Sequence, residues 1–359
     1  GWSILVVDPK AELCLMTMEH RRRAGNTILS LNPFNSFDLG SHGYNPLSAL
    51  EPDSDDFPDD AMGQVESIIK VEGSDPHWPQ GAQDLVTAVS MFVRIEIPNG
   101  TYGDVRALLS LDADDLRHMI LNETFEYKGA TYRGVIRAAE EDGWEEIINK
   151  IARFGDISPD NKEMHGVISE ALVQTRWLDS RPIKRDLGGP AFDFTQLKRT
   201  PTTVYLSLPA RRLGTHSSWL RLMIATVVQA LMKDTARAEV PVLLMLDEYF
   251  AIAGGDTGRA TFPMIDRNMA MLRGYGIKLW TVWQDLSQAQ RAYGRDGFET
   301  FLANAGVLQT FATQDLTTSD YISKRTGQTT RRVKSQGISQ SMQPGQAPGS
   351  SINESANVS

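Results

Sequence analysis

Short apolar runs that each end near a polar or turn residue recur along the chain. Continuous runs of this kind are typical of strands that are buried on both faces of a sheet. Helical patterns such as Ser218–Lys233 and Phe262–Arg273 separate most of them, which predicts a parallel α/β sheet. The runs are Ile4–Val7, ending at Asp8; Thr27–Leu31, ending at Asn32; Thr203–Leu208, ending at Pro209; Val242–Leu246, ending at Asp247; Lys278–Trp283, ending at Gln284; and Gly306–Phe311, closely followed by Thr313.

The polar residues that end these runs mark one edge of the predicted sheet. Ligands of open α/β sheets bind beyond the carboxyl ends of the parallel strands. Asp8, Asn32, Asp247 and Gln284 would all converge there. The pattern therefore indicates the active edge before any motif is considered.

A helical insertion interrupts the strand pattern between Asn45-Pro46 and about Thr175. Its entry, "EPDSDDFPDDAMGQ", is acidic and contains proline, as expected of an exposed connector. We assign residues 59–178 to this inserted all-α domain. The helical patterns are Ala61–Lys70, Gly81–Val93, Ala113–Leu121, Tyr132–Glu141, Trp144–Ala152 and Lys162–Trp177.

Composition is that of a folded protein with a polar tail. The 359 residues suggest about two domains, and 41% are hydrophobic and 23% charged. Residues 329–359 are rich in Ser, Gln, Gly and Pro, which predicts a disordered tail. The net charge of -9 argues against a wholly basic nucleic-acid coat but leaves room for local basic contacts. Candidates are His20-Arg21-Arg22-Arg23, Lys184-Arg185, Arg211-Arg212, and Arg331-Arg332 with Lys334.

Several classes of protein and site are disfavoured by what the sequence lacks. The single cysteine, Cys14, excludes an internal disulfide and a cysteine-based zinc site, which favours a reducing compartment. The six histidines are scattered without metal-ligand spacing. No apolar run of about 18 residues or more and no leader is present. Trp280 and Trp283 are expected to be core residues of a central strand.

The run "PVLLMLDEYFAIAG" stops at two adjacent carboxylates, Asp247 and Glu248. A hydrophobic strand that ends in Asp-Glu is the Walker B arrangement. In it the first acid lies near a Mg²⁺ bound to nucleotide phosphates, and the second orients or activates the attacking water. The alternative is that both acids only cap the following helix, where negative charge suits the dipole. The stretch alone leaves both interpretations open.

Further stretches resemble one family, the TraG-type coupling-protein ATPases of type IV secretion. They occur in order from Ile4 to about Thr330, together with the strand that ends at Asp247-Glu248. These stretches are "ILVVDPKAEL", "LNPF", "SHGYNPLSAL", "LRGYGIKLWTVWQDLSQAQRAYG" and "FLANAGVLQTFATQDLTTSDYISKRTGQTT". The resemblance implies a RecA-like P-loop NTPase core, here residues 1–58 and 179–328, that carries the inserted all-α domain.

The resemblance also implies site residues and partners. Asp247 and Glu248 would be the Walker B pair, with Mg²⁺ near Asp247, and Gln284 would sense the γ-phosphate of ATP. Arg273 would be a finger that reaches a neighbour's nucleotide, and Asp8 and Lys10 match the family's Asp-Pro-Lys, whose role we leave open. The family forms hexameric rings at the cytoplasmic face of the bacterial inner membrane. They pass relaxase-linked single-stranded DNA and secreted proteins into the secretion channel.

The sequence departs from the family in lacking a P-loop. No G-x-x-x-x-G-K-[ST] is present, and "GGDTGRAT" at Gly254–Thr261 lacks the lysine and follows the Walker B strand. In the family the P-loop and the membrane helices precede the Asp-Pro-Lys strand. Since Gly1 is not a natural start, we expect an internal fragment that does not hydrolyse ATP alone. The alternatives are an FtsK-type DNA translocase and a substrate-docking module without hydrolysis.

Overall fold

The computed structural model describes residues 1–71, 76–121, 124–155, 161–254, 262–311 and 313–327, and the backbone of 332–341 and 349–358. The chain forms two compact units. The first is Gly1–Gln284 with Gln288–Leu308, and the second is Asp285–Ser287 with Gln309–Ser359.

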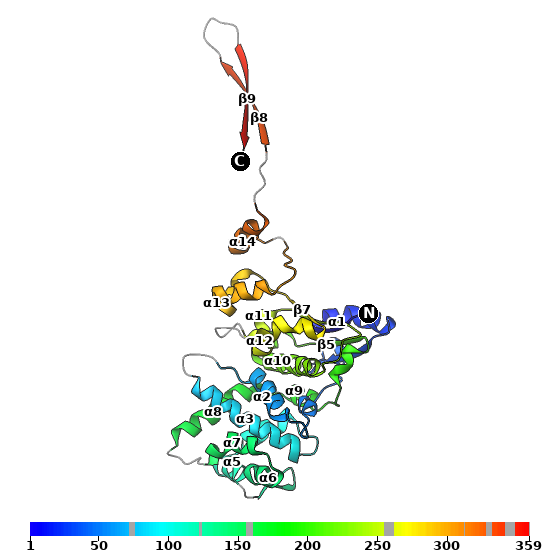
Figure 1. Cartoon of the computed structure of the whole chain (residues 1–359), viewed down its shortest axis with the longest axis vertical. Coiled ribbons are helices and arrows are strands. Elements are labelled where there is room, and N and C mark those ends of the chain that lie inside the picture. The colour runs from blue at the N-terminus through cyan, green and yellow to red at the C-terminus, as the bar shows by residue number, and fades with distance from the viewer. Residues whose placement is uncertain are drawn as a thin grey trace. The chain divides into compact units, whose positions relative to one another are not determined.

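A five-stranded sheet lies in the first unit (Figure 1), and its strand order is β2-β5-β1-β6-β7. Every neighbouring pair is parallel. The predicted α/β class with a mostly parallel sheet is therefore confirmed. The strands are β1 Ser3–Val7, β2 Thr27–Leu31, β5 Thr202–Leu206, β6 Val242–Leu246 and β7 Ile277–Thr281.

Helices cover the sheet because its strands are apolar on both faces. On one face Val6 and Tyr205 form a small core with buried Cys14, which lies on α1 (Glu12–Arg23). On the other face Leu5, Val7 and their neighbours join a larger core that includes α10 (Ala210–Lys233). All five residues of β5 are buried, as expected of an interior strand whose two faces are both covered.

The sixth predicted strand, Gly306–Phe311, is not formed. This segment has no regular structure, and its Val307 and Phe311 are 83% and 80% exposed. An apolar run becomes a strand only where a neighbouring strand supplies backbone partners, and β7 is at the edge of the described sheet. Because β7 is an edge strand of the described sheet, Trp280 on it is 48% exposed and is not the core residue that the sequence predicted.

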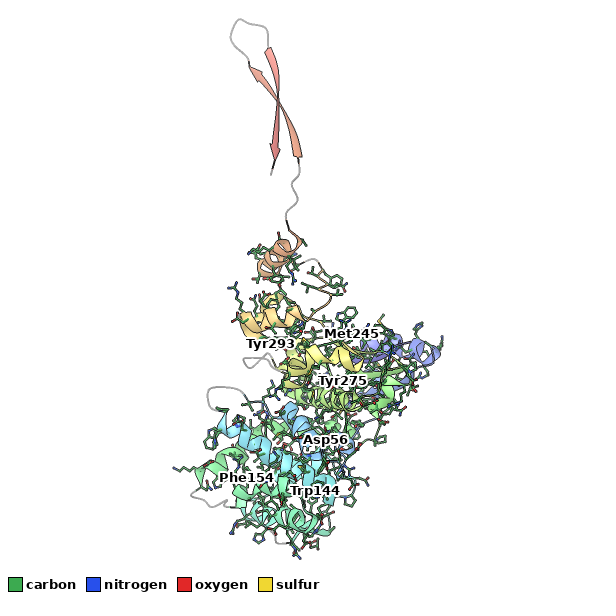
Figure 2. The ribbon with its side chains drawn as sticks, viewed as in Figure 1. Asp56, Trp144, Phe154, Met245, Tyr275 and Tyr293 are labelled. Atoms are coloured by element: carbon green, nitrogen blue, oxygen red, sulfur yellow. The ribbon has the colours of Figure 1, made fainter. Side chains whose placement is uncertain are left out.

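The insertion is mainly helical, and each helix predicted there is present with shifted ends. Its helices are α2 Phe57–Ile68, α3 His77–Glu96, α4 Tyr102–Leu109, α5 Ala113–Ile120, α6 Val135–Asp142, α7 Glu145–Ile151 and α8 Lys162–Thr175. α3 is the central helix, because its residues from Leu85 to Val93 are all buried. Figure 2 shows Trp144 and Phe154 among these helices and Met245 in the strand region. The domain boundaries at 59 and 178 stay a prediction.

Two features of the insertion differ from the sequence-based picture. A small antiparallel hairpin, β3 Thr124–Tyr127 and β4 Ala130–Arg133, interrupts the helices, so the insertion is not wholly α-helical. Its turn is Lys128-Gly129, where both residues have positive φ, the conformation of the tight turns that join paired strands. Helix α2 begins at buried Phe57, so the second half of the acidic connector is helical.

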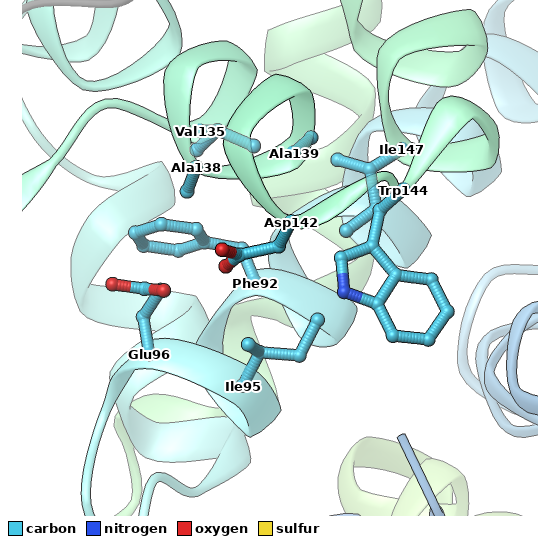
Figure 3. A pocket seen from close by; sticks show the side chains of 9 residues that line it. All are labelled: Phe92, Ile95, Glu96, Val135, Ala138, Ala139, Asp142, Trp144 and Ile147. Atoms are coloured by element: carbon cyan, nitrogen blue, oxygen red, sulfur yellow. The ribbon is translucent and has the colours of Figure 1, made fainter. Parts of the chain in front are cut away.

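The core of the insertion is closely filled. A cavity of about 10 Å³ lies between α3, α6 and α7, and Figure 3 shows the side chains that line it, Trp144 and Phe92 among them. A volume of this size holds at most one water molecule. At its rim Glu96 and Asp142 both form ion pairs with Arg133. This cavity is too small for a ligand.

The remaining elements are 3₁₀ segments and helices. They are the 3₁₀ segments η1 Ser36–Asp38, η2 Pro46–Ala49, η3 Ala152–Gly155, η4 Arg176–Asp179, η5 Phe194–Lys198 and η6 Arg273–Tyr275, and the helices α9 Arg181–Asp186, α11 Tyr249–Ala253, α12 Pro263–Leu272, α13 Leu286–Ala303 and α14 Leu316–Thr326. In the described ranges no helix is long and apolar enough to cross a membrane.

An antiparallel hairpin, β8 Arg332–Ser341 and β9 Gly349–Val358, lies in the predicted disordered tail. Its backbone pairing differs from the expected lack of structure. A two-stranded hairpin is at best marginally stable without a covering layer. The assignment of residues 329–359 as a disordered tail therefore stays a prediction.

Asp186, at the end of α9, is a buried carboxylate beside the loop that follows β2. The Ser41 hydroxyl donates a hydrogen bond to its Oδ1, while Oδ2 and the nearby Trp219 Nε1 have no partner of good geometry. Burial raises the pKa of Asp186 to about 6, against the opposing effect of the Ser41 hydrogen bond. The ionised carboxylate therefore destabilises the fold.

We expect Asp186→Asn to remove a pH dependence from the free energy of unfolding. The pKa of Asp186 is raised in the folded state, so its contribution is complete below the unfolded pKa of 3.8 and is lost as pH rises through about 6. Urea denaturation at pH 4 and pH 7 should show that wild type loses about 2–3 kcal/mol relative to the variant over this range. Parallel pH profiles for the two proteins would contradict the prediction.

Candidate active site

Asp247, Glu248 and Gln284 come together at the carboxyl edge of the sheet. The first two directly follow β6, and Gln284 follows β7, the next strand in the sheet. Past the ends of both strands the backbones remain paired, because Val282 N–H donates to Leu246 C=O at 3.0 Å and Tyr249 N–H donates to Val282 C=O at 3.2 Å. These bonds fix the two loops that carry the polar side chains.

Glu248 adopts a left-handed backbone conformation, with φ 53° and ψ 43°. This conformation is uncommon for a residue with a side chain and costs about 1–3 kcal/mol. Glu248 lies at the N-cap position of α11, yet its side chain makes no capping hydrogen bond. Asp247 Oδ1 accepts a hydrogen bond from Glu248 N–H at 2.9 Å. The contacts of the Glu248 side chain are therefore not those of a helix cap.

The Glu248 carboxylate is held by Gln284. Gln284 Nε2 donates to Glu248 Oε2 at 3.0 Å and lies 3.4 Å from Oε1. Gln288 in turn fixes Gln284, since its Nε2 donates to Gln284 Oε1 at 3.1 Å and its Oε1 accepts from Gln284 N–H at 3.2 Å. The amide group of Gln284 is thereby oriented with its NH₂ toward Glu248.

Gln288 is a residue that the sequence analysis missed. The signal was available, because Gln288 follows Gln284 by four residues at the start of a helical pattern, and residues at this spacing lie on one face. Gln288 is buried and Gln284 is exposed, as expected of a residue that orients another.

An aromatic layer supports these loops from behind. Tyr249, Trp283, Tyr293 and Phe301 contact one another with ring centroids 5.1–6.1 Å apart. Tyr293, labelled in Figure 2, donates a hydrogen bond of 2.7 Å to Asp266 Oδ1. Burial raises the pKa of Asp266, and the Tyr293 hydrogen bond opposes that shift. Trp283 lies past the end of β7 and is partly buried against the core, so it is not the core residue of a central strand that the sequence predicted.

Asp8 and Asn32 follow β1 and β2 at the same edge of the sheet, but each side chain forms a hydrogen bond with a residue close to it in sequence. Asp8 Oδ2 accepts a hydrogen bond of 2.7 Å from Cys14 N–H in α1, and burial raises the pKa of Asp8. Asn32 Oδ1 accepts from Ser36 N–H at 2.9 Å and closes its own loop. Of the three residues of the Asp-Pro-Lys motif, only Lys10 is exposed. The predicted convergence therefore holds for β6 and β7 and not for Asn32.

Arg273 is not brought to these carboxylates within one chain. It lies in η6, just before the first residue of β7, whereas Gln284 follows the last. Gly276, with φ 76°, turns the chain into the strand, and its C=O accepts from Val242 N–H at the amino end of β6. Arg273 is therefore exposed at the opposite edge of the sheet, and a role at the nucleotide would require a second subunit.

The carboxylates suit a cation that is held mainly by phosphates. In the described ranges no group of three or more His, Cys, Asp or Glu could hold a metal alone. Mg²⁺ usually binds one or two carboxylates, several waters and substrate phosphates, and the half-buried pair of Asp247 and Glu248 fits this pattern. Most of the "GGDTGRAT" segment lies outside the described residues.

A parallel sheet with adjacent acids at its carboxyl edge defines an α/β protein with its candidate site at the strand ends. The family model for "Type IV secretory system Conjugative DNA transfer" matches residues 1–357, and the chain belongs to this family. The family match confirms the resemblance and disfavours the FtsK-type alternative.

Relatives and one solved structure agree with this assignment. Conjugal transfer protein TraG of Agrobacterium fabrum (strain C58 / ATCC 33970) is 26% identical over 343 residues, which are 93% of this chain and 48% of that protein. Protein VirD4 of Rhizobium radiobacter is 25% identical over 348 residues, 94% of this chain and 46% of that protein. The chain thus spans about half the length of these relatives.

The structure of the bacterial conjugative coupling protein TrwBdeltaN70, in its unbound monoclinic form, aligns with a TM-score of 0.53 at 14% identity. The alignment covers 98% of this chain and 71% of that one. This likeness confirms the predicted RecA-like fold.

Proposed function

We propose that this chain is the motor portion of a coupling protein, which uses ATP to move DNA and protein substrates into a type IV secretion channel. The observation that carries the proposal is the Glu248–Gln284 contact across the ends of β6 and β7 in a chain of this family. A carboxylate and an amide held together at the carboxyl edge of a parallel sheet suit the orientation of a water molecule for attack on a phosphate.

Each residue has a distinct task in this proposal. Mg²⁺ bound to ATP would supply charge neutralisation at the phosphates. Asp247 would face that cation through water, and Glu248 would orient a water molecule and accept its proton. When nucleotide is present, Gln284 would exchange its side-chain bonds to Glu248 and Gln288 for a contact of its NH₂ with the γ-phosphate.

The proposal requires elements beyond this chain. The printed sequence has no phosphate-binding G-x-x-x-x-G-K-[ST], and Arg273 is at the opposite edge of the sheet. We propose that a P-loop elsewhere in the whole protein completes the site, and that a homo-hexamer brings Arg273 to a neighbouring site. In this proposal an N-terminal membrane region would hold the ring at the cytoplasmic face of the inner membrane.

The 359-residue chain alone is expected to show no ATP turnover, with or without single-stranded DNA. Stabilisation of the transferred phosphoryl group needs the phosphate cradle as well as the acids. A steady-state phosphate-release assay with ATP and Mg²⁺ tests this, and the control is a protein that contains this chain together with a P-loop. DNA-stimulated phosphate release by the chain alone would contradict the proposal that a P-loop outside this chain completes the site.

A substrate-docking module without hydrolysis is the second candidate, since the P-loop motif is absent from the printed sequence. It predicts no turnover even when a P-loop is present in the same polypeptide. The same phosphate-release assay therefore separates the two candidates through its control protein.

A further inference from the structure

A second cavity lies at the carboxyl edge of the sheet, where β2 and β5 end. It measures about 440 Å³, and its lining residues come from three parts of the chain. Phe34 follows β2, Arg212 and His216 lie in the first turns of α10 after β5, and Arg176 and Trp177 belong to η4. Because β2 and β6 are separated by β5 and β1, this cavity is distinct from the Glu248–Gln284 site.

The cavity is positively charged although the chain carries a net charge of -9. The residues that line it include two arginines and neither Asp nor Glu. Arg176 and Arg212 are both exposed, and neither forms an ion pair with a carboxylate in the part of the chain that the structure describes. The nearest acid along η4, Asp179, is held by Arg106 at 2.8 Å. Two guanidinium groups are therefore left to face solvent at one cavity.

Aromatic rings and an unused donor complete the cavity. Phe34 is half-buried, with the Arg212 guanidinium 5.5 Å from its ring centroid and the His216 ring edge-on at 5.5 Å. Trp177 is 4% exposed, and its indole Nε1 has no hydrogen-bond partner among the described residues. Burial, with a smaller effect from Arg212, lowers the pKa of His216, so the two arginines carry the charge.

Cations beside aromatic faces are the combination that binds single-stranded nucleic acid. Arginines contact the phosphates, and aromatic side chains accept stacked bases of any sequence. The active site does not use the basic pairs Lys184-Arg185, in α9, and Arg211-Arg212, in α10. Both helices contribute residues to the cavity lining, and Arg212 is one of them. They would extend the positive surface along a bound strand.

We propose that this cavity, defined by Arg176, Arg212, Phe34 and Trp177, binds the sugar-phosphate backbone and one base of a single-stranded nucleic acid. The inference rests on the proposed function for the identity of the substrate. The proposed nucleic-acid site lies where β2 and β5 end, whereas the hydrolytic carboxylates lie where β6 ends. The nucleic acid and the nucleotide would therefore bind at the same edge of the sheet but beside different β-strands.

The test is fluorescence anisotropy of a labelled dT20 strand with the 359-residue chain, without ATP, over a range of salt concentrations. Arg176→Gln with Arg212→Gln should raise Kd about ten-fold and lower the salt slope by about 1.4, because two phosphate contacts are lost. The matched control is Arg117→Gln with Arg237→Gln, which removes the same charge from exposed arginines elsewhere and should change neither value.

A third variant separates stacking from charge. Phe34→Leu keeps an apolar side chain but removes the ring, so Kd should rise about five-fold or more while the salt slope stays unchanged. Circular dichroism of all variants confirms folding. No binding by wild type, or equal losses in the cavity and control variants, would overturn the inference. Displacement by dTMP or inorganic phosphate at concentrations near the strand's Kd would identify a mononucleotide site instead, which also overturns it.

The outcome is independent of hydrolysis. Glu248→Gln should leave the Kd for dT20 unchanged, because the carboxylate lies at the β6 end of the sheet. If the cavity variants bind dT20 more weakly than wild type while the P-loop-containing protein shows no ATP turnover, only the proposed motor function fails. If turnover is present and the cavity variants bind normally, only the cavity assignment fails.

Discussion

Glu248→Gln is expected to lower ATP turnover by about 10²–10⁴-fold in a protein that contains this chain together with a P-loop. This range is the usual contribution of a positioned general base. The amide keeps the size of the side chain and can still contact Gln284, but it cannot accept the proton of the attacking water. Nucleotide binding should persist, since Glu248 does not hold the phosphates, so ATP should remain bound.

Phosphate release measures the turnover of this variant, and retention of labelled ATP through gel filtration measures the bound nucleotide. Glu145→Gln makes the same chemical change at an exposed position of α7 and should leave both values at the wild-type level. If the Glu248→Gln protein hydrolysed ATP at the wild-type rate, Glu248 could not be the general base.

Arg273→Ala is expected to reduce turnover by about 10³-fold or more in the assembled protein, with nucleotide binding nearly intact. Arginine fingers contribute effects of this size by neutralising charge on the transferred phosphoryl group. Arg273 lies at the amino end of β7, away from Glu248 at the carboxyl end of β6, so its action would be in trans. The alternative is an exposed arginine favoured by the helix dipole at the end of α12.

Mixed assemblies distinguish these two roles. When Arg273→Ala and Glu248→Gln subunits are combined, some interfaces pair an intact finger with an intact site, and part of the hydrolysis should return. No recovery despite verified co-assembly would contradict action in trans. Arg267 would then be the next candidate, although it forms an ion pair with Glu66 at 2.8 Å.

The strands and their active edge could be predicted because buried parallel strands leave a direct signal in the sequence. Each continuous apolar run from Ile4–Val7 to Lys278–Trp283 overlaps a strand of the sheet. Gly306–Phe311 carries the same signal but forms no strand, since strand formation depends on a neighbour that local sequence does not reveal. The helical pattern predicted from Tyr132 onward overlaps β4, so the sequence does not predict the β3–β4 hairpin and its Lys128-Gly129 turn.

The sequence predicted the site residues that directly follow a strand, but it did not predict the residues that hold those side chains and loops in place. Asp247, Glu248 and Gln284 follow apolar runs, and the structure brings them to one edge. Gln288 and Asp266 act through contacts made only after folding, with Gln284 and with Tyr293 respectively. Similarly, Arg211-Arg212 was visible as a basic pair, but its proximity to Phe34 and Trp177 required the fold.

The central claim is that the edge formed by β6 and β7 is the place of ATP hydrolysis. A structure of the assembled, P-loop-containing protein with a non-hydrolysable ATP analogue and Mg²⁺ tests it most directly. The account predicts Mg²⁺ beside Asp247, a water molecule on Glu248, and the Gln284 amide turned toward the γ-phosphate. Nucleotide bound elsewhere, with the Glu248–Gln284 hydrogen bond unchanged and no cation beside Asp247, would contradict it.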